Sequence, residues 1–214
     1  MDAIEAIRTT RAIRRFTDDP VTTYEIQEIL DAANQAPSGG NLQPWRFVVC
    51  TDPDVKRAVG EVYEACYDRY ERKLLETLGA MAEDPATAKQ LRASRRLADT
   101  IDQAPVLVAV LAQQVSLTLE DDQGPIDIGT VHASVYPAVQ NLLVAARALG
   151  IGGALTTVYK SREDDLRRIL GVPDGFEVAA LVPLGRPRGR FGVAPRRPAA
   201  AVTHWNRYGN KEPS

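Results

Sequence analysis

Two short stretches near the N-terminus carry the side chains best suited to binding a small molecule. In the first, Arg8 to Phe16, four arginines fall within eight residues. Guanidinium groups match the oxygens of a phosphate, and Arg11, Arg14 and Arg15 share one side if helical geometry continues through them. A solvated charged face produces the same pattern, so this stretch alone leaves both interpretations open.

The second stretch, Ala36 to Phe47, combines a helix-ending proline with two glycines and several polar side chains. Pro37 should end the preceding helix, and the pair Gly39–Gly40 allows positive φ angles or a close backbone approach. Groups that donate and accept hydrogen bonds come from Ser38, Asn41 and Gln43. Such a loop suits a flat heterocycle, although an ordinary helix-to-strand connector uses the same residues.

The other chemically reactive residues argue against several kinds of site. Cys50 and Cys66 are the only cysteines, and we expect buried free thiols rather than a disulfide framework. His132 and His204 lie far apart without cysteine or histidine companions at ligand spacing, so we expect no metal site. No catalytic triad or pair of catalytic carboxylates stands out, so no side chain is assigned as catalytic.

The composition is that of one soluble globular domain over residues 1–214. Of 214 residues, 44% are hydrophobic and 25% are charged, and the formal net charge is −2. With this net charge, the protein has no overall positive electrostatic field that would attract nucleic acid or an anionic membrane. The N-terminus lacks a secretory pattern, and no stretch approaches the roughly 20 apolar residues of a membrane span, so we expect a cytoplasmic protein.

Capping residues predict that each of the two polar stretches directly follows a helix. Asp2 can cap a first helix that leads into the arginines, and Thr22 with Glu25 predicts a capping box for the helix that leads into the loop. Phe47–Cys50 then predicts a buried strand.

A peripheral helical excursion is expected over about 54–103. Asp52–Pro53 opens a long helix with apolar positions through Tyr70 and Leu74 that ends near Gly79, and Asp84–Pro85 opens another. This region could be a lid, a dimer contact or a plain surface hairpin, and the sequence does not separate these roles.

The second half of the chain supplies the predicted core. The apolar run Val106–Ala112 predicts a central strand buried on both faces, and 127–149 predicts a core helix that Pro137 kinks and Gly150 closes. The elements expected after this helix are a short extended run within 150–159, a helix capped by Ser161, a strand at 176–185 and an extended arm at about 186–214. Helices interleaved with few strands predict an α+β or α/β fold with a mixed sheet.

Several of these stretches together resemble the nitroreductase family of FMN-dependent oxidoreductases. The resemblance spans nearly the whole chain in order. It rests on Thr10–Phe16 as the basic motif, Ala36–Phe47 as the flavin loop, Gln140–Gly152 as the end of the core helix and Pro195–Pro198 as a basic-proline signature.

The resemblance implies an α+β fold with a central mixed, mainly antiparallel sheet, in an intertwined homodimer that binds FMN at the subunit interface. It implies that the phosphate is held by the basic motif and the tail, and that loop residues come from the partner subunit. It also implies a backbone N–H near flavin N5 around 155–157. The residues carried over are Arg11, Ala12, Arg14, Arg196 or Arg197 for the phosphate, Pro37, Ser38, Gly39 and Asn41 for the loop, and Leu155, Thr156 and Thr157 for the turn.

The basic motif departs from the family pattern in one respect. The family often has Arg-Arg-Ser where this chain has Thr10, Arg11 and Ala12, so one guanidinium and one hydroxyl contact are missing. Phosphate binding is therefore expected to depend more on Arg14 and the tail arginines.

The activity implied is NAD(P)H-dependent reduction of nitroaromatics, quinones or related acceptors by ping-pong hydride transfer through FMN. A specialised enzyme of the same fold, such as a reductive dehalogenase or a biosynthetic dehydrogenase, is the alternative within the family. A flavin-binding protein without turnover and a non-flavin interaction module are alternatives of other classes. The sequence does not distinguish NADH from NADPH and does not identify the physiological substrate.

Overall fold

The computed structural model describes residues 1–114, 119–126 and 129–212. At its centre is a four-stranded sheet in the order β1-β2-β6-β5, whose neighbouring strands are all antiparallel. One parallel bridge, between Ala12 and Gly153, adds the N-terminal segment at the β5 edge and makes the sheet mixed, as predicted. The strands are β1 (Trp45–Cys50), β2 (Val106–Gln113), β5 (Gly152–Gly153) and β6 (Phe176–Gly185).

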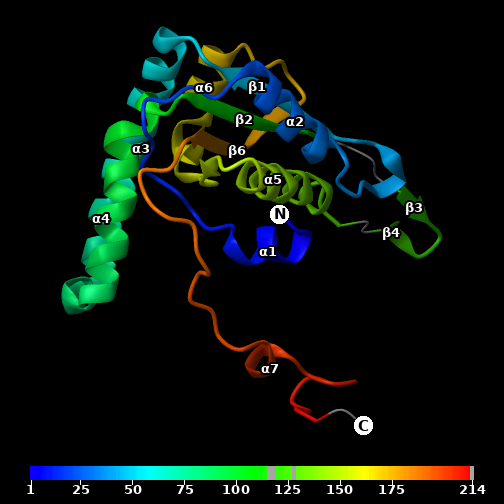
Figure 1. The fold of residues 1–214 in the computed structure, drawn as a ribbon. Helices are drawn as coiled ribbons and strands as arrows, with labels where there is room; N and C mark the ends of the chain where they lie inside the picture. Colours follow the sequence, from blue (N-terminus) through cyan, green and yellow to red (C-terminus); the bar gives the residue numbers. More distant parts are fainter. Residues whose placement is uncertain (115–118, 127–128, 213–214) are drawn as a thin grey trace.

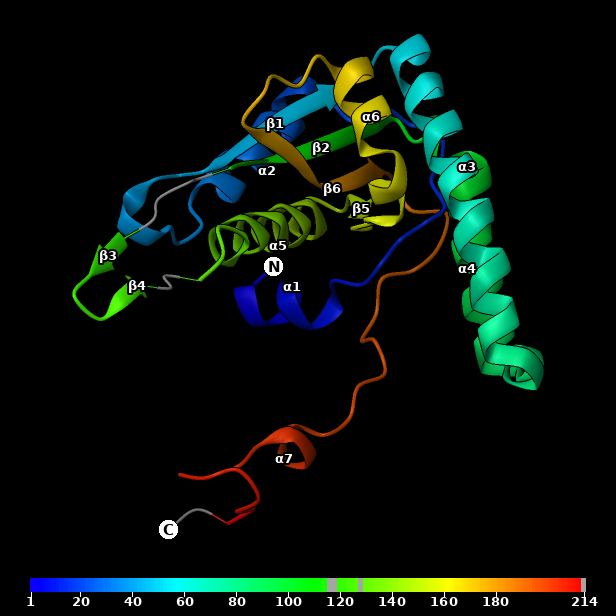
Figure 2. The same cartoon turned by 180° about the vertical axis from the view of Figure 1, so that it is seen from behind.

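Helices cover both faces of this sheet (Figures 1 and 2). One face is covered by α2 and α5, and the other by α3, α4 and α6. The α+β architecture predicted from the sequence is therefore confirmed. The helices are α1 (Ala3–Thr9), α2 (Thr23–Asn34), α3 (Pro53–Leu78), α4 (Pro85–Thr100), α5 (His132–Ala148), α6 (Glu163–Leu170) and α7 (Ala199–Val202).

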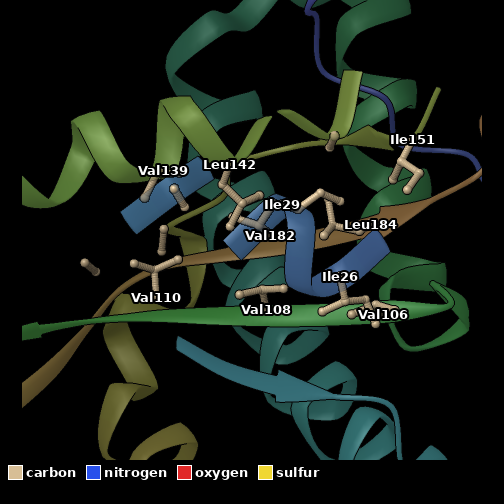
Figure 3. Packing of buried hydrophobic residues seen from close by; sticks show 14 of the residues in the cluster. Ile26, Ile29, Val106, Val108, Val110, Val139, Leu142, Ile151, Val182 and Leu184 are labelled. Carbon is tan, nitrogen blue, oxygen red and sulfur yellow. The ribbon is translucent and has the colours of Figure 1, made fainter. Parts of the chain in front are cut away.

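The central strand β2 divides the core into two clusters. Its residues at 106, 108 and 110 pack with Ile29 of α2 and Leu142 of α5, as Figure 3 shows. Its residues at 107, 109 and 111 pack with Val59 of α3 and Leu166 of α6. Because both faces of β2 are buried, the strand is apolar throughout, which is why its sequence was recognisable as a central strand.

The helix starts follow the predicted chemistry. The Thr22 hydroxyl accepts from the Glu25 N–H while the Glu25 carboxylate accepts from the Thr22 N–H, which completes the capping box of α2. The Asp52 carboxylate caps α3, and the Asp84 carboxylate caps α4. Within α3 the predicted apolar stripe is wrong at one position, because Tyr67 is buried whereas Tyr70 is 47% exposed.

The predicted helix from 127 to 149 begins later than expected. Residues 127 and 128 lie outside the described residues, and Gly129 has a φ of 79°, which is incompatible with a right-handed helix. Helix α5 therefore starts at His132. Its end is as predicted: the Gly150 N–H donates to Arg147 O at 3.0 Å and the Ile151 N–H to Ala146 O at 2.8 Å, which is a Schellman motif.

The short extended run predicted within 150–159 is present as β5 and a bridge at Thr156, and it ends where the 3-10 helix Val158–Arg162 begins. The predicted cap of the next helix is wrong. Ser161 lies inside the 3-10 helix, so its hydroxyl does not cap α6 and instead donates to Cys66 Sγ at 3.4 Å. The N-cap of α6 is Arg162.

Three parts project from the layered body. Helices α3 and α4 form an antiparallel pair at one side, and a hairpin of β3 (Leu119–Asp121) and β4 (Gly124–Ile126) lies at the opposite side (Figures 1 and 2). The later part of the C-terminal arm runs away from the body and ends beyond α7. No helix in the described ranges has the length and apolar character needed to cross a membrane.

Candidate flavin site

The arginine-rich segment lies along the short strand β5. The Ile13 N–H donates to Gly153 O at 2.9 Å, and Ala12 bridges Gly153 in parallel. Gly152 makes this close approach possible, because a Cβ added to it would lie 2.7 Å from Ile13 Cβ. Arg11 and Arg14, on either side of this contact, are therefore held at the edge of the sheet rather than on a free helix face.

A cavity of about 300 Å³ beside this segment is lined predominantly by arginine. Arg11 and Arg14 contribute to it, and their guanidinium groups form no hydrogen bond or ion pair with any residue that the structure describes. A convergence of unneutralised guanidinium groups favours an anion in their midst. The residues that line the cavity are Arg11, Ala12, Ile13, Arg14, Arg15, Ala93, Arg96, Arg188, Gly189 and Arg190.

The start of the C-terminal arm packs beside the arginine segment. The Thr17 N–H donates to Arg186 O and the Arg188 N–H to Arg15 O, both at 2.9 Å. Further along the arm, the Phe191 ring lies 4.1 Å from the Arg147 guanidinium carbon. The tail is thus fixed against the basic motif as far as Phe191.

The two tail arginines assigned to the phosphate are not at this cavity. Arg196 lines a neighbouring hollow together with Arg8 and Thr10, and its guanidinium bonds the carbonyl of Pro195 at 2.9 Å. Arg197 is exposed on the arm. The structure therefore brings Arg196 near the basic motif but does not join either tail arginine to Arg11 and Arg14.

The predicted loop is a tight exposed turn at the start of α5. The Ser38 hydroxyl accepts from the Gln43 N–H at 2.8 Å, and the Gly39 N–H donates to the Ser134 hydroxyl at 3.2 Å. Gly40 and Asn41 both have a φ of 56°, which glycine and asparagine tolerate better than other residues. Pro37 and Asn41 are exposed, and the Asn41 side-chain oxygen accepts a hydrogen bond from Gln43 Nε2 at 3.2 Å.

Within one chain, helix α5 separates this loop from the basic motif. The loop bonds Ser134 near the start of α5, whereas Thr9 accepts from Arg147 Nε at 2.9 Å near its end. Thirteen residues of helix correspond to a separation of about 20 Å. Figure 2 shows the loop beside the β3–β4 end of α5, α1 alongside α5, and the segment after α1 leading away at the other end.

The turn at 155–157 follows β5 and is anchored at its middle residue. Thr156 exchanges two backbone hydrogen bonds with Leu181, each 3.0 Å, and its side chain is hydrogen-bonded to the Tyr63 hydroxyl at 2.8 Å. Burial raises the pKa of Tyr63, so this hydroxyl stays protonated at neutral pH. The N–H groups of Leu155 and Thr157 have no acceptor among the described residues, and Leu155 is 41% exposed.

Comparison with known proteins identifies the family. The model of the Nitroreductase family matches residues 7–186, which is most of the chain. This chain belongs to the nitroreductase family. The family match covers the basic motif, the loop and the turn but ends at the start of the arm.

Three known proteins illustrate the range of this family. The chain is 31% identical to a NADH dehydrogenase of Thermus thermophilus over 96% of both chains. It is 27% identical to iodotyrosine deiodinase 1 of Rattus norvegicus, over 86% of this chain and 61% of that protein. An FMN- and NADPH-dependent nitroreductase, NfnB of a Sphigopyxis strain, has the same fold with a TM-score of 0.70 and 21% identity, covering 97% of this chain and 100% of that one.

The residues of this nitroreductase-family chain fit FMN at two points. Arg11 and Arg14 provide unpaired donors for a phosphate dianion beside a cavity. The turn at 155–157 offers backbone N–H groups without protein acceptors on an exposed edge, which suits the polar edge of a flavin ring. The basic motif and the turn are connected through β5, so one rigid edge carries both.

Several residues at this site were not predicted from the sequence. No role in a site was assigned to Tyr63 or Ser134. Nor was one assigned to Arg188 and Arg190 of the arm. Their spacing of two is a usable signal, because alternate residues of an extended segment lie on the same side.

Proposed function

We propose that this protein is an FMN-dependent oxidoreductase that uses NAD(P)H to reduce nitroaromatic, quinone or related small acceptors. Membership of the nitroreductase family supports the general class. The names of the Thermus thermophilus NADH dehydrogenase and of the FMN- and NADPH-dependent nitroreductase support the pairing of a flavin with a nicotinamide co-substrate.

The observation that carries this proposal is the pair of unneutralised arginines on the segment that lies along β5. Arg11 and Arg14 would hold the FMN phosphate, with the Ala12 backbone beside them and Arg196 or Arg197 joining from the arm. FMN, when bound, supplies the redox chemistry. The chain positions the cofactor: the edge of β5 holds the arginine segment, and Tyr63 with Leu181 holds the turn whose N–H groups at 155 and 157 have no acceptor among the described residues.

We also propose that the working unit is a homodimer. The 20 Å separation along α5 implies that Pro37, Ser38, Gly39 and Asn41 act on the flavin held by the partner chain. The exposed apolar side chains on the arm, among them Val193 at 72% and Tyr208 at 94% exposure, support a second chain that covers them. The adjacency of Ala93 and Arg96 of α4 to the arginine cavity favours the lid interpretation of the excursion.

The spectrum and the anaerobic reduction of the purified protein test this function. We expect a yellow protein with flavin absorption, which NADH or NADPH bleaches and a nitroaromatic or quinone restores. A colourless protein that takes up no added FMN would contradict the cofactor assignment. A flavoprotein that neither nicotinamide reduces would instead be a flavin-binding protein without this turnover.

Reductive dehalogenation is a second candidate, supported by the similarity to rat iodotyrosine deiodinase 1. Release of halide from a monohalogenated phenol by the reduced protein, measured by ion chromatography, distinguishes it from nitro reduction. Halide release faster than nitroarene or quinone reduction would favour this candidate.

A further inference from the structure

Arg15, Arg96 and Arg188 lie between two neighbouring cavities and line both of them. Arg15, Arg96 and Arg188 line the cavity of about 300 Å³ that Arg11 and Arg14 also line. The same three arginines line a second cavity of about 250 Å³, to which neither Arg11 nor Arg14 contributes. The basic surface is therefore longer than the part assigned to the flavin phosphate.

The three arginines come from separate parts of the chain. Arg15 follows the basic motif, Arg96 is on α4, and Arg188 is at the start of the arm. The Arg188 N–H donates to Arg15 O at 2.9 Å and its Nε to Phe16 O at 2.6 Å, so two of the three segments are joined directly. Such convergence is a property of the fold and not of one charged stretch of sequence.

Little negative charge offsets these groups. The guanidinium groups of Arg15 and Arg96 form no hydrogen bond or ion pair with any residue in the described ranges. Arg188 is 3.7 Å from an Asp18 carboxylate oxygen, but both side chains are more than half exposed, so the pair contributes little. Asp18 is also the one acidic residue among those that line either cavity.

We propose that Arg15, Arg96 and Arg188 form a second anion site, which binds a phosphate group of the nicotinamide dinucleotide. This inference rests on the proposed function, because it places the co-substrate beside the flavin site. FMN brings one phosphate, which is assigned to Arg11 and Arg14, and neither of these residues lines the second cavity. A nicotinamide dinucleotide brings a pyrophosphate and, in NADPH, a 2′-phosphate that arginine recognises elsewhere.

The other residues that line the second cavity have side chains suited to contact one end of a nucleotide. Phe16 offers an aromatic surface, while Thr100 and Gln103 offer donors and acceptors in the second cavity. A net charge of −2 over the whole chain and the concave shape of the site favour a small anion over a nucleic acid.

Calorimetric titration of the protein, as purified, with two probes tests the site. Adenosine 2′,5′-bisphosphate represents the 2′-phosphate end, and ADP represents the pyrophosphate. Arg96→Gln is the main variant, because the Arg96 side chain has no described partner whose loss could unfold the protein. Arg92→Gln is the matched control: it lies one turn away on α4, is exposed and lines neither cavity.

We expect Arg96→Gln and Arg188→Gln to weaken binding of a probe by about tenfold each, as the loss of one charge-assisted hydrogen bond implies, while Arg92→Gln changes nothing. Weakening of the bisphosphate alone assigns the 2′-phosphate and is accompanied by a higher KM for NADPH only. Weakening of ADP, alone or with the bisphosphate, assigns the pyrophosphate and raises the KM for both nicotinamides.

Three results would overturn the inference: no binding of either probe by the unaltered protein, equal binding by Arg96→Gln and Arg92→Gln, or loss of FMN from Arg96→Gln. The last would show that these arginines hold the flavin phosphate itself. The titrations do not require turnover. Failure of the proposed function, seen as a protein without flavin or without reduction, is therefore distinguishable from failure of this site.

Discussion

At the scale of the residue, the arginines of this chain differ in whether a carboxylate neutralises them. Arg95 lies within 4 Å of Asp68, Glu71 and Asp99, and Arg186 lies 2.6 Å from Glu25. Arg11 and Arg14 have no such partner among the described residues. Paired arginines stabilise the fold locally, whereas unpaired ones that line a cavity are available to a ligand.

Replacement of both Arg11 and Arg14 by alanine should reduce FMN retention. Each charge-assisted hydrogen bond contributes about 1.5 kcal/mol or more, so the double variant should bind FMN roughly a hundredfold more weakly. Flavin absorbance after dialysis measures this. Arg69→Ala with Arg72→Ala is a matched control, because these exposed arginines of α3 have the same spacing and no described side-chain partner. A double variant at 11 and 14 that stays fully loaded would remove the phosphate assignment.

The side-chain hydrogen bond between Tyr63 of α3 and Thr156 attaches the turn at 155–157 to a helix that packs against the sheet. Tyr63→Phe leaves the Thr156 hydroxyl buried without its partner, which should cost about 1–3 kcal/mol in the free energy of unfolding. Adding Thr156→Val removes the unsatisfied group, so the double variant should recover part of that loss. Urea denaturation of the four proteins in the cycle measures the coupling; additive losses would show that the pair does not act as a unit.

At the scale of the element, β5 is only two residues long, yet it holds the basic motif against the sheet. Both of its residues are buried glycines, and side chains from neighbouring segments occupy the space beside them. A Cβ on Gly153 would lie 2.8 Å from Leu184 Cδ2 and 3.1 Å from a backbone oxygen of Pro183. The absence of side chains on β5 is thus what lets the arginine segment add to this edge.

Gly152→Ala should displace the basic motif. Its new Cβ would lie 2.7 Å from Ile13 Cβ, an atom too close to the backbone to move alone, so we expect a loss of about 1–3 kcal/mol in stability together with weaker FMN retention. Gly192→Ala is the control, because no atom lies within 4 Å of a Cβ there. Thermal unfolding and flavin content measure both effects; equal behaviour of the two variants would mean that β5 does not position the arginines.

The elements with local signals were predictable from the sequence. The capping residues Thr22, Asp52 and Asp84 start their helices as expected, because a cap is a contact between residues close in sequence. The predicted start of α5 was wrong because its N-cap, Val131, makes no side-chain capping bond, and the local contact that does occur there, from the His132 N–H to the Thr130 hydroxyl at 3.3 Å, was not recognised. The short α7 and the two-residue β5 carry no periodicity that a sequence can display.

The candidate site was predictable only in part, for the same reason. The basic motif and the loop are contiguous stretches whose composition indicates a ligand. Their contacts with Ser134 and Arg147 join residues 95 and 138 positions apart, and no local pattern encodes these pairings. The contribution of α4 to the arginine cavity likewise depends on how the excursion folds back against the body.

At the scale of the whole molecule, the two groups of residues that we propose to bind FMN lie at opposite ends of α5 within one chain. One group comprises Arg11, Arg14 and the turn at 155–157, and the other is the loop from Pro37 to Asn41. The arm with its exposed Trp205 and Tyr208 projects away from the body, as Figures 1 and 2 show. A second chain that covers the arm could bring its loop to the first chain's arginines, which gives two equivalent composite sites.

Mixed dimers test this arrangement. One chain carries Arg11→Ala and Arg14→Ala, and the other carries Gly40→Val, which places a β-branched residue at a φ of 56° and should distort the loop. In a composite arrangement, the mixed dimer has one site with both defects and one with none. Dimers purified through two different tags should therefore bind about one FMN, whereas each variant homodimer binds almost none.

The number of FMN molecules bound per mixed dimer distinguishes a composite site from a site built by one chain. It depends on whether the arginines and the loop of a site come from the same chain. If a single chain built a whole site, each site of the mixed dimer would carry one defect, and the mixed dimer would be as empty as the homodimers. A monomer in sedimentation at micromolar concentration would rule out the composite site directly. Recovery of half the flavin requires both that Arg11 and Arg14 bind it and that the loop acts across the interface, since neither property alone restores an intact site.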